Sequence, residues 1–557
     1  MAVNTNQAMG RLLLFTFAAL LIVVFSASDS QAATDASIHE QLMKLTSESS
    51  AARRKAISAL ADTDDVRLVP FFEDYLKGNV SLYKENLVIR EDTKDAQGQK
   101  QISLKDALTR DAIGDKVVAS DLKDLDISNK ERVLARDAIM RLRLSDPDIE
   151  ARLQAIVRAG DSSNAALLPL LKARLAAEKD SRAQIGLKES IALLLLDSDA
   201  KDDEVQSAIS DLGEVHSGRA LAKLKDMQKK SPPAFKAGLD QAVDRIERYQ
   251  FWAQGLGYVF SGLSLGSILV LMALGLSIIF GLMGVINMAH GELMMIGAYA
   301  TFVTQKAFEY MIDQHWLSAS SFNYYFVAAI PVSFLVAALA GYIIEITIIR
   351  FLYGRPLETL LATYGVSLVL TQLVRLQFGD NIAVNSPTWL QGGVEIMRDV
   401  VLPYNRCFII CFCMACIGGM HLIISKTNLG LLLRATTQNR NMAAALGVQT
   451  RRIDGYTFAL GAGLAGLAGC ALTQVGGITP DMGQNYIVDS FMVVVTGGVG
   501  KLAGAVWAGM ALGCIDKLFE PLFQAVWAKV IILIFVVMFI QWRPSGLFPA
   551  KGRFADA

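Results

Sequence analysis

The sequence has few of the residue types that build soluble catalytic or metal sites. It contains five histidines among 557 residues, and all six cysteines follow residue 406. Because the first 406 residues carry no thiol, they suit an oxidising compartment. The formal net charge is zero, which gives no support to nucleic-acid binding.

Charge is also scarce in one half of the chain. Only 17 of the 53 Lys+Arg and 14 of the 53 Asp+Glu follow Gln250, although more than half of the chain lies there. The mean hydropathy is +0.37 and 53% of the residues are hydrophobic, which exceeds what an ordinary soluble enzyme shows. These patterns predict a polar first part and a membrane-embedded second part.

The first residues have the order of a secretory signal peptide. Arg11 precedes the apolar run "LLLFTFAALLIVVF", and the small-residue stretch "SASDSQAAT" comes next, with Ser30-Gln31-Ala32 as the best cleavage site. The alternative is an uncleaved anchor helix, because the run is only slightly short for a membrane span. Both interpretations predict that the residues after Ala33 are exported. We therefore divide the chain into a signal peptide (1–32), an exported, periplasmic helical-repeat domain (33–250) and a transmembrane domain (251–557).

The exported domain reads as short amphipathic helices joined by Asp-containing turns. Leu and Ala recur at helical spacing in stretches such as "IEARLQAIVRAGDSSNAALLPLLKARLAAEKD", a pattern typical of degenerate HEAT-like arrays. Between Asn79 and Leu104 the pattern alternates and indicates an inserted β-hairpin. Such arrays usually bind other proteins, so we favour a docking surface over a passive spacer. The polar stretch "KKSPPAFKAGLDQ" is predicted to be a Pro-broken link to the membrane.

The second part is predicted to be an all-α, polytopic helical membrane bundle of about 8–10 spans, in contact with the lipid bilayer. The segments are Leu256–Met283, Ile286–Phe308, Tyr324–Ile349, Leu357–Phe378, Cys407–Ser425, Gly455–Val475, Ile487–Val499, Leu502–Phe519 and Ala525–Gln541. Starting from the exported side, the inside loops hold 11 of the 17 basic residues. This bias agrees with the positive-inside rule.

Motifs for catalysis, metal binding or nucleotide binding are incomplete. In "VVTGGVGKLAG", Val495 replaces the first glycine of a phosphate-binding loop and Leu502 replaces its hydroxyl residue. The stretch "HGEL" lacks the second histidine of a zinc protease, and the cysteines of "CFIICFCMACIGG" have no second ligand cluster. We expect no catalytic residue, metal or cofactor.

Two glycine-rich stretches predict broken membrane helices. They are "GVINMAHGELMMIG" and "TGGVGKLAGAVWAG", and paired breaks mark transport pathways. Asn287, His290 and Glu292 fall in the first stretch, where polar groups are expensive and tend to face a cavity. We interpret them as pathway or gate residues; the alternative is an internal clasp without substrate contact. Thr363, Tyr364 and Gln372 also interrupt an apolar segment and are candidates to line the path.

The inside loop "KTNLGLLLRATTQNRNMAAALGVQTRRID" holds four arginines and a helix-like stretch that Gly447 ends. This loop, "GLSLGSILVLMALGLSIIFGLMGVINMAHGELMMIGAYAT", "TGGVGKLAGAVWAG" and the ending "RPSGLFP" resemble the permease subunits of the high-affinity branched-chain amino acid class of ABC importers. In that class such a loop couples the permease to ATP-hydrolysing subunits. The resemblance implies that Arg434, Ala435, Asn441, Ala444, Gly447 and Arg451 belong to this contact.

The exported domain makes the chain most similar to the first permease subunit of urea ABC importers. The resemblance implies a non-catalytic subunit of a bacterial inner membrane importer for urea, a small polar solute. It also implies two ATP-binding subunits, a second permease subunit and a periplasmic substrate-binding protein as partners. The alternatives are a branched-chain amino acid importer and, from other classes, an intramembrane enzyme using His290 and Glu292 or a sensor.

Overall fold

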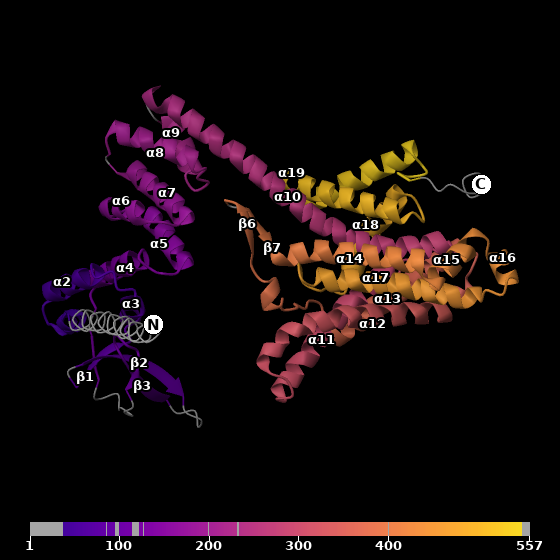
Figure 1. Cartoon of the computed structure of the whole chain (residues 1–557), viewed down its shortest axis with the longest axis horizontal. Helices are drawn as coiled ribbons and strands as arrows, with labels where there is room; N and C mark the ends of the chain where they lie inside the picture. The colour runs from indigo at the N-terminus through magenta and orange to yellow at the C-terminus, as the bar shows by residue number, and fades with distance from the viewer. Residues whose placement is uncertain are drawn as a thin grey trace, which may run out of the picture. The chain divides into compact units, whose positions relative to one another are not determined.

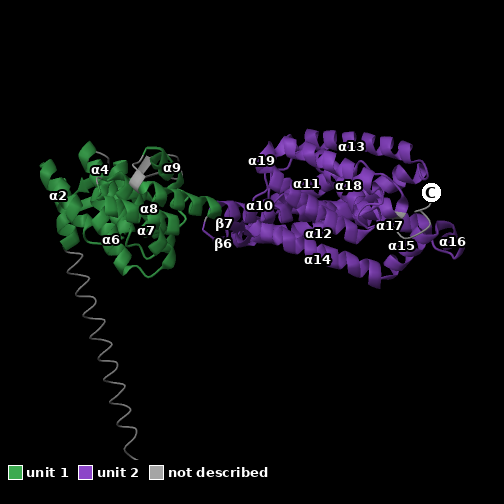
Figure 2. Cartoon of the chain, turned by 90° about the horizontal axis from the view of Figure 1, so that it is seen from above, with its two compact units in different colours: residues 1–249 green, residues 250–557 purple. Residues whose placement is uncertain are grey.

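The computed structural model describes residues 37–84, 86–94, 100–113, 122–125, 127–198, 200–230, 233–398 and 400–548. The chain forms two compact units, Met1–Tyr249 and Gln250–Ala557, called unit 1 and unit 2 (Figure 2). The predicted signal peptide, residues 1–32, lies outside the described residues.

Unit 1 is a stack of short helices, as the apolar spacing predicts (Figure 1). Its helices are η1 (Lys44–Thr46), α2 (Ser50–Ala61), α3 (Leu68–Lys77), α4 (Asn129–Arg143), α5 (Ile149–Asp161), η3 (Ala165–Leu167), α6 (Leu168–Ala177), α7 (Ser181–Asp197), α8 (Asp202–Glu214) and α9 (Leu221–Lys230). Turn residues begin several of them. Ser128 and Glu131 form a capping box at α4, and Asp180 accepts hydrogen bonds from two backbone N–H groups of α7.

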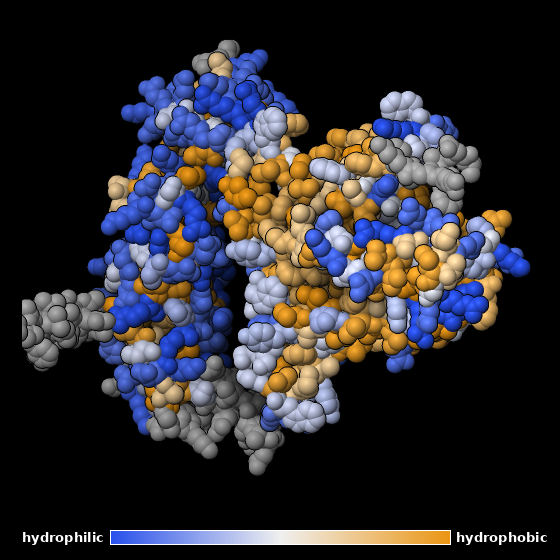
Figure 3. Space-filling view, turned by 45° about the vertical axis from the view of Figure 1, so that its right-hand side comes forward, coloured by the Kyte–Doolittle hydropathy of each residue, from blue (hydrophilic) through white to orange (hydrophobic). Residues whose placement is uncertain are grey.

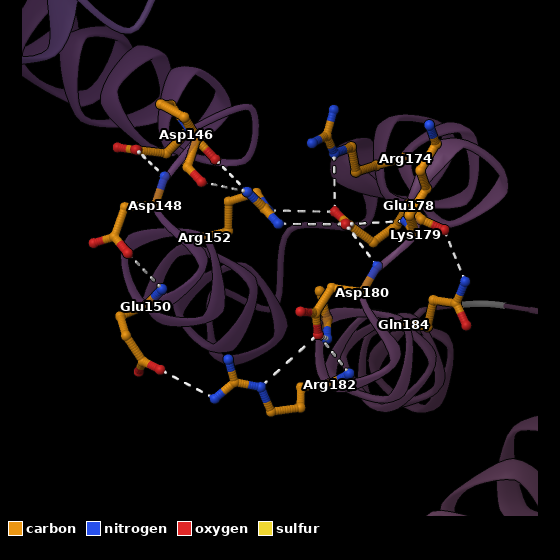
Figure 4. A network of polar contacts seen from close by, with 12 residues as sticks. Asp146, Asp148, Glu150, Arg152, Arg174, Glu178, Lys179, Asp180, Arg182 and Gln184 are labelled. Atoms are coloured by element: carbon orange, nitrogen blue, oxygen red, sulfur yellow. Dashed lines mark hydrogen bonds and ion pairs between the residues drawn. The ribbon is translucent and has the colours of Figure 1, made fainter.

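Buried carboxylates join neighbouring helices of this stack. Glu178, in the turn after α6, lies 3.4 Å from Arg152 Nε on α5 and 3.5 Å from Arg174 Nε on α6 (Figure 4). The buried Glu131 likewise contacts Arg53 at 2.8 Å, and the buried Glu189 lies 3.5 Å from Arg219. Each pair lets a charged group occupy the interior because the charge is compensated there.

The inserted β-structure is larger than the predicted hairpin. The strands are β1 (Val80–Tyr83), β2 (Asn86–Lys94), β3 (Lys100–Asp106), β4 (Ala112–Ile113) and β5 (Lys123–Asp124). They form one antiparallel sheet in the order β4-β3-β2-β1-β5. The additional strands β4 and β5 have two residues each, too short for alternation to be read from sequence.

Unit 2 is a helical bundle with one small hairpin. Its elements are α10 (Pro233–Met283, which begins in unit 1), α11 (His290–Asp313), η4 (Ala319–Tyr324), α12 (Tyr325–Thr347), η5 (Ile349–Phe351), α13 (Pro356–Phe378), η6 (Thr388–Leu390), β6 (Gly393–Met397), β7 (Val400–Pro403), α14 (Tyr404–Lys426), α15 (Asn428–Gln438), α16 (Arg440–Ala445), α17 (Thr450–Leu472), α18 (Met482–Gly497) and α19 (Leu502–Trp542).

Among the described residues, six helices are long and apolar enough to cross a membrane: α10, α12 with its flanking turns, α13, α14, α17 and α19. Each of the nine predicted segments falls mainly on a helix, but the number of spans differs. Two predicted segments lie on α19, which bends where Gln524 leaves the helical conformation. Helix α18 has only 16 residues, and α11 is not among the six.

The predicted Pro-broken link is confirmed only at its start, where α9 ends at Lys230 and α10 begins at Pro233; from Pro233 the stretch is helical, and α10 runs to Met283. Proline is favoured in the first turn of a helix, where its missing N–H has no intrahelical partner. The stretch "PAFKAGLDQ" therefore starts α10.

Helices α10 and α17 form the centre of unit 2. Their most apolar windows are 83% buried, against 17–28% for the other four candidate spans. Hydrophobic side chains cover much of the visible face of unit 2, whereas unit 1 is mainly hydrophilic (Figure 3). The β6–β7 hairpin and the α15–α16 segment lie at opposite ends of the bundle (Figures 1 and 2).

Candidate functional site: a broken helix pair and a polar row

The first predicted break lies between α10 and α11. Gly284 has a φ of +65°, a conformation that glycine adopts without steric cost. The Oδ1 atom of Asn287 accepts a hydrogen bond from the Ala289 N–H at 3.1 Å, and α11 begins at His290. Asn287, His290 and Glu292 are each at most 1% exposed. The break therefore places three polar side chains inside the bundle.

His290 lies at the level of the middle of α17. Its Nε2 atom lies 3.1 Å from the carbonyl oxygen of Met272 on α10. A Cβ atom added to Gly275 would lie 3.1 Å from the imidazole and 2.4 Å from the Gly461 carbonyl oxygen. Gly461 is eleven residues from each end of α17 (461 − 450 and 472 − 461), or about 16 Å at ~1.5 Å per residue.

Several polar atoms here have no hydrogen-bond partner among the described residues. They include both oxygens of Glu292, Nδ2 of Asn287 and Nδ1 of His290. The Ser367 side chain of α13 lies beside Glu292, but neither carboxylate oxygen makes a hydrogen bond of normal geometry. An unpaired buried polar group costs about 1–3 kcal/mol. Such groups are uncommon in folded proteins, so their clustering marks this region as a functional candidate.

One face of α13 is a row of hydroxyl residues. The buried residues of this helix are Thr359, Thr363, Ser367 and Thr371, spaced four apart on one face. The Thr363 hydroxyl accepts a hydrogen bond from the Met288 N–H at 3.1 Å, which joins the row to the break. The opposite face carries exposed apolar residues, including Leu361, Leu368 and Leu376. We call the four residues the hydroxyl row.

The three predicted lining residues differ in their exposure to solvent. Thr363 is buried in the hydroxyl row, whereas Tyr364 is 45% exposed and Gln372 is also exposed. The sequence interpretation did not select Thr359, Ser367 or Thr371. Their four-residue spacing was visible in the sequence and is the signal that could have identified them.

The second predicted break lies between α18 and α19, beside the first. Gly498 and Gly500 have φ values of +100° and +74°. A Cβ atom at Gly281, near the end of α10, would lie 2.4 Å from the Gly500 Cα atom. The segment that imitates a phosphate-binding loop is thus packed against a helix end.

Glycines also bring the central helices into close contact. A Cβ atom at Gly291 of α11 would lie 2.2 Å from the Gly483 carbonyl oxygen of α18. One at Gly469 of α17 would lie 2.0 Å from the Met294 carbonyl oxygen of α11. Small residues at such positions allow backbones to approach closely in membrane bundles. The repeated glycines of "GAGLAGLAG" (461–469) therefore serve close packing.

The predicted coupling loop folds into α15 and α16 rather than one helix. Asn439 interrupts it with extended backbone, and its side chain accepts from the Met442 N–H at 3.0 Å to cap α16. Gly447 ends this region with a φ of +87°. The six predicted contact residues are exposed: Arg434, Ala435, Asn441, Ala444, Gly447 and Arg451.

Arg440 anchors this loop and was not selected from the sequence. Its guanidinium pairs with both carboxylate oxygens of Asp454 on α17, with Nη1–Oδ1 at 3.2 Å, and lies 4.2 Å over the Tyr353 ring. Burial alone would lower the pKa of Arg440, but the Asp454 carboxylate outweighs it and raises that pKa. Burial and the same carboxylate raise the pKa of Tyr353 to about 12.

Comparison with known proteins identifies the family. The family described as "Branched-chain amino acid transport system / permease component" matches residues 258–541, just over half of the chain. The chain belongs to this permease family. It is 31% identical to the high-affinity branched-chain amino acid transport system permease protein BraD of Pseudomonas aeruginosa over 298 residues. This alignment covers 52% of the present chain and 95% of BraD.

Two further relatives of the permease agree with this assignment. The permease is 30% identical to LivH of Escherichia coli K12 over 299 residues, and this alignment covers 52% of the chain and 94% of LivH. It is 23% identical to LivM of the same organism over 310 residues, covering 51% of the chain and 69% of LivM. Both relatives are high-affinity branched-chain amino acid transport system permease proteins. No solved structure matches the permease.

Proposed function

We propose that this chain is the membrane permease of an ATP-driven importer for branched-chain amino acids. The family match carries the proposal, because it extends over residues 258–541 of the helical bundle. BraD and LivH, which are named for high-affinity branched-chain amino acid transport, align over nearly their full lengths. The family assignment favours transport over the intramembrane enzyme and the sensor.

Coupling to ATP hydrolysis is proposed to occur at the α15–α16 segment. The exposed Arg434, Asn441 and Arg451 would contact ATP-binding subunits, and the Arg440–Asp454 pair would transmit the movement to α17. A second permease subunit and a substrate-binding protein would complete the importer. Because basic loops favour the cytoplasmic side, α15–α16 is proposed to face the cytoplasm of a bacterial inner membrane, and unit 1 the periplasm.

The polar groups at the first break are proposed to line the path or its gate. Asn287, His290, Glu292 and the hydroxyl row supply donors and acceptors inside the bundle, and His290 lies at the depth of the middle of α17. Polar groups inside a membrane bundle generally face one another or a pathway rather than lipid. A moving solute can bind in turn to the polar atoms that have no hydrogen-bond partner among the described residues.

Urea is the second candidate substrate, and unit 1 is the observation that favours it. BraD and LivH align over 95% and 94% of their lengths with only 52% of this chain, which leaves them no counterpart of a domain the size of unit 1. Such an exported domain is the feature shared with the urea permeases. The names of the curated relatives nevertheless favour amino acids.

The deciding experiment measures uptake of labelled leucine and labelled urea at micromolar concentrations in cells with and without this gene. Loss of leucine uptake alone supports the proposal. Loss of urea uptake alone would replace the substrate but retain the permease. If neither uptake changed while the partner subunits were expressed, the importer proposal would be wrong.

A further inference from the structure

The hydroxyl row of α13 ends at a cluster of charged residues. Arg375 follows Thr371 by four residues, which places both on the same face of the helix. Arg375 Nη2 donates to both carboxylate oxygens of Asp481, at 2.8 and 2.7 Å. Its Nε atom lies 3.0 Å from Asp380 Oδ1. Asp380 lies just after α13, whereas Asp481 immediately precedes α18. We call Arg375, Asp380 and Asp481 the Arg375 cluster.

The Arg375 cluster lies at the end of unit 2 that is opposite to the α15–α16 segment. Helix α13 starts near that segment, because Tyr353, three residues before Pro356, accepts a hydrogen bond from Arg440 of α16 at 2.7 Å. The other end of α13 leads towards the β6–β7 hairpin, which lies at the opposite end of the bundle (Figure 1). In the orientation proposed above, the cluster therefore faces the exported side.

Two loops meet at this end of the hydroxyl row. The loop after α13 pairs with the loop before α18, because the backbone N–H groups of Ile382 and Ile478 donate to each other's carbonyl oxygens at 3.0 and 2.8 Å. The Asn385 N–H also donates to Gln305 Oε1 of α11 at 3.0 Å. We call residues 379–385 and 478–481 the cap. The cap joins α11, α13 and α18 at one place.

The side chains next to the Arg375 cluster on its inner side are buried and have polar atoms without partners. Thr371 and Tyr299 are 2% and 3% exposed, and neither hydroxyl has a hydrogen-bond partner among the described residues. Tyr299 lies within electrostatic reach of the cluster, and its ring lies 5.0 Å from that of Phe378. The side chains of the cluster itself are 34–83% exposed. The cluster thus lies between solvent and the buried hydroxyls.

We propose that the Arg375 cluster is an outer gate of the solute path. Arg375 holds the cap shut through Asp481 and releases it to open the path to the exported side. Exposed ion pairs contribute little net stability, because water and salt screen them, so this contact can break and re-form in each import cycle. Gly379, with a φ of +85°, and the pair Gly476-Gly477 give both loops residues that tolerate large backbone changes.

This inference rests on the proposed import function and names a residue that gates its path. The gate is separate from the first break, because Arg375 follows Thr363 by twelve residues (375 − 363), or about 18 Å along α13 at ~1.5 Å per residue. The alternative is a permanent brace between α13 and α18. An apolar interior would suit a brace, whereas buried hydroxyls without partners suit a space that a polar solute enters.

The test measures how fast a thiol at position 371 reacts with a membrane-impermeant, negatively charged methanethiosulfonate. The reagent is added to spheroplasts that carry the full-length Thr371→Cys chain. Adding Arg375→Gln should speed labelling at least about fivefold, because loss of an exposed ion pair shifts an opening equilibrium by about that factor. The matched control is Lys306→Gln, which breaks a 2.7 Å ion pair within α11 near the same end of the bundle. It should change the rate by less than about twofold.

A buried native thiol separates gating from unfolding. Cys470 is 1% exposed and should stay unlabelled in every variant, which peptide mass spectrometry reads separately from position 371. The charge swap Arg375→Asp with Asp481→Arg should restore slow labelling. If Thr371→Cys itself does not fold, Ser367→Cys, one turn deeper, is the second reporter. Equal labelling with and without Arg375→Gln, no restoration by the swap, or parallel labelling of Cys470 would overturn the proposal.

Uptake in cells distinguishes failure of this inference from failure of the proposed function. If uptake of leucine or urea needs the gene but Arg375→Gln leaves labelling unchanged, the gate proposal is wrong and the importer remains. If neither uptake needs the gene, the proposed function fails. The contrast between Arg375→Gln and Lys306→Gln in labelling then still decides whether the cluster closes this end of the bundle.

Discussion

Arg440 and Asp454 lie fourteen residues apart and form a two-point ion pair that fastens α16 to α17. Asp454 is 4% exposed, and the Tyr353 hydroxyl accepts a further hydrogen bond from Arg440 at 2.7 Å. Nearby, Glu345 of α12 pairs with Arg350 at 3.2 Å. The segment proposed to meet the ATPase is thus attached to α17, one of the two central helices.

Arg440→Lys should uncouple ATP hydrolysis by the assembled importer from transport. Lysine keeps the charge but cannot form the two-point contact or stack on Tyr353. Because Arg440 is partly exposed, we expect a modest loss of stability, about 1–2 kcal/mol. Uptake should fall severalfold while the assembled importer still hydrolyses ATP. The control is Arg452→Lys on the exposed part of α17. Parallel loss of uptake and hydrolysis would contradict a transmitting role.

Glu292→Gln should impair transport without unfolding the bundle. The carboxylate has no hydrogen-bond partner among the described residues, so a neutral side chain of the same shape should leave the melting temperature unchanged or raise it. Uptake should fall at least about tenfold if Glu292 contacts the solute. Glu309→Gln, in a residue paired with Lys306 at 2.7 Å near the other end of α11, is the control. Normal uptake by Glu292→Gln would favour the internal clasp.

The hydroxyl row predicts that substitutions at two neighbouring positions of α13 have different effects on the rate of uptake. Thr371→Val retains side-chain shape but removes a buried hydroxyl that has no partner among the described residues, and it should reduce the initial rate of uptake. Gln372→Leu changes an exposed position and should leave that rate within about twofold. The opposite result would show that the exposed face of α13, rather than the hydroxyl row, faces the path.

The close contact between α11 and α18 predicts a steric effect. In Gly291→Ala the new methyl group would lie 2.2 Å from the Gly483 carbonyl oxygen, so the helices must move apart. We expect a loss of about 1–3 kcal/mol in the free energy of unfolding. Gly365→Ala is the control, because nothing lies within 4 Å of its added Cβ atom. Thermal unfolding of both variants should show destabilisation of Gly291→Ala alone.

Unit 1 should lose stability in acid through Glu131. Burial alone would raise the pKa of this carboxyl, but hydrogen bonds from Arg53 and Ser128 outweigh it and lower the pKa. A depressed folded-state pKa contributes stability above the unfolded value of about 4.3. That contribution disappears as the pH falls through the folded-state pKa. Hydrogen exchange of α4 in the full chain should show this loss, and Glu131→Gln should show a smaller pH dependence.

Only part of the candidate site could be predicted from the sequence. Glycine patterns located both breaks, because a chain that needs positive φ or close backbone approach selects glycine. Of the three predicted lining residues, Thr363 is buried, whereas Tyr364 and Gln372 are exposed. Tyr364 and Gln372 were selected with it because polarity alone does not say which side of a helix is buried. That depends on where the neighbouring helices lie, and here the buried side is the one with Thr359, Ser367 and Thr371.

The sequence by itself determined the helical class, the polar and apolar halves and the family, because hydropathy, spacing and motifs are local properties of the chain. Only the tertiary structure decided that Gly281 meets Gly500 and that Arg440 meets Asp454. The first contact joins segments distant in sequence, and the second joins two helices across a short loop. Helix packing creates both contacts, and it is not encoded in a short window of residues.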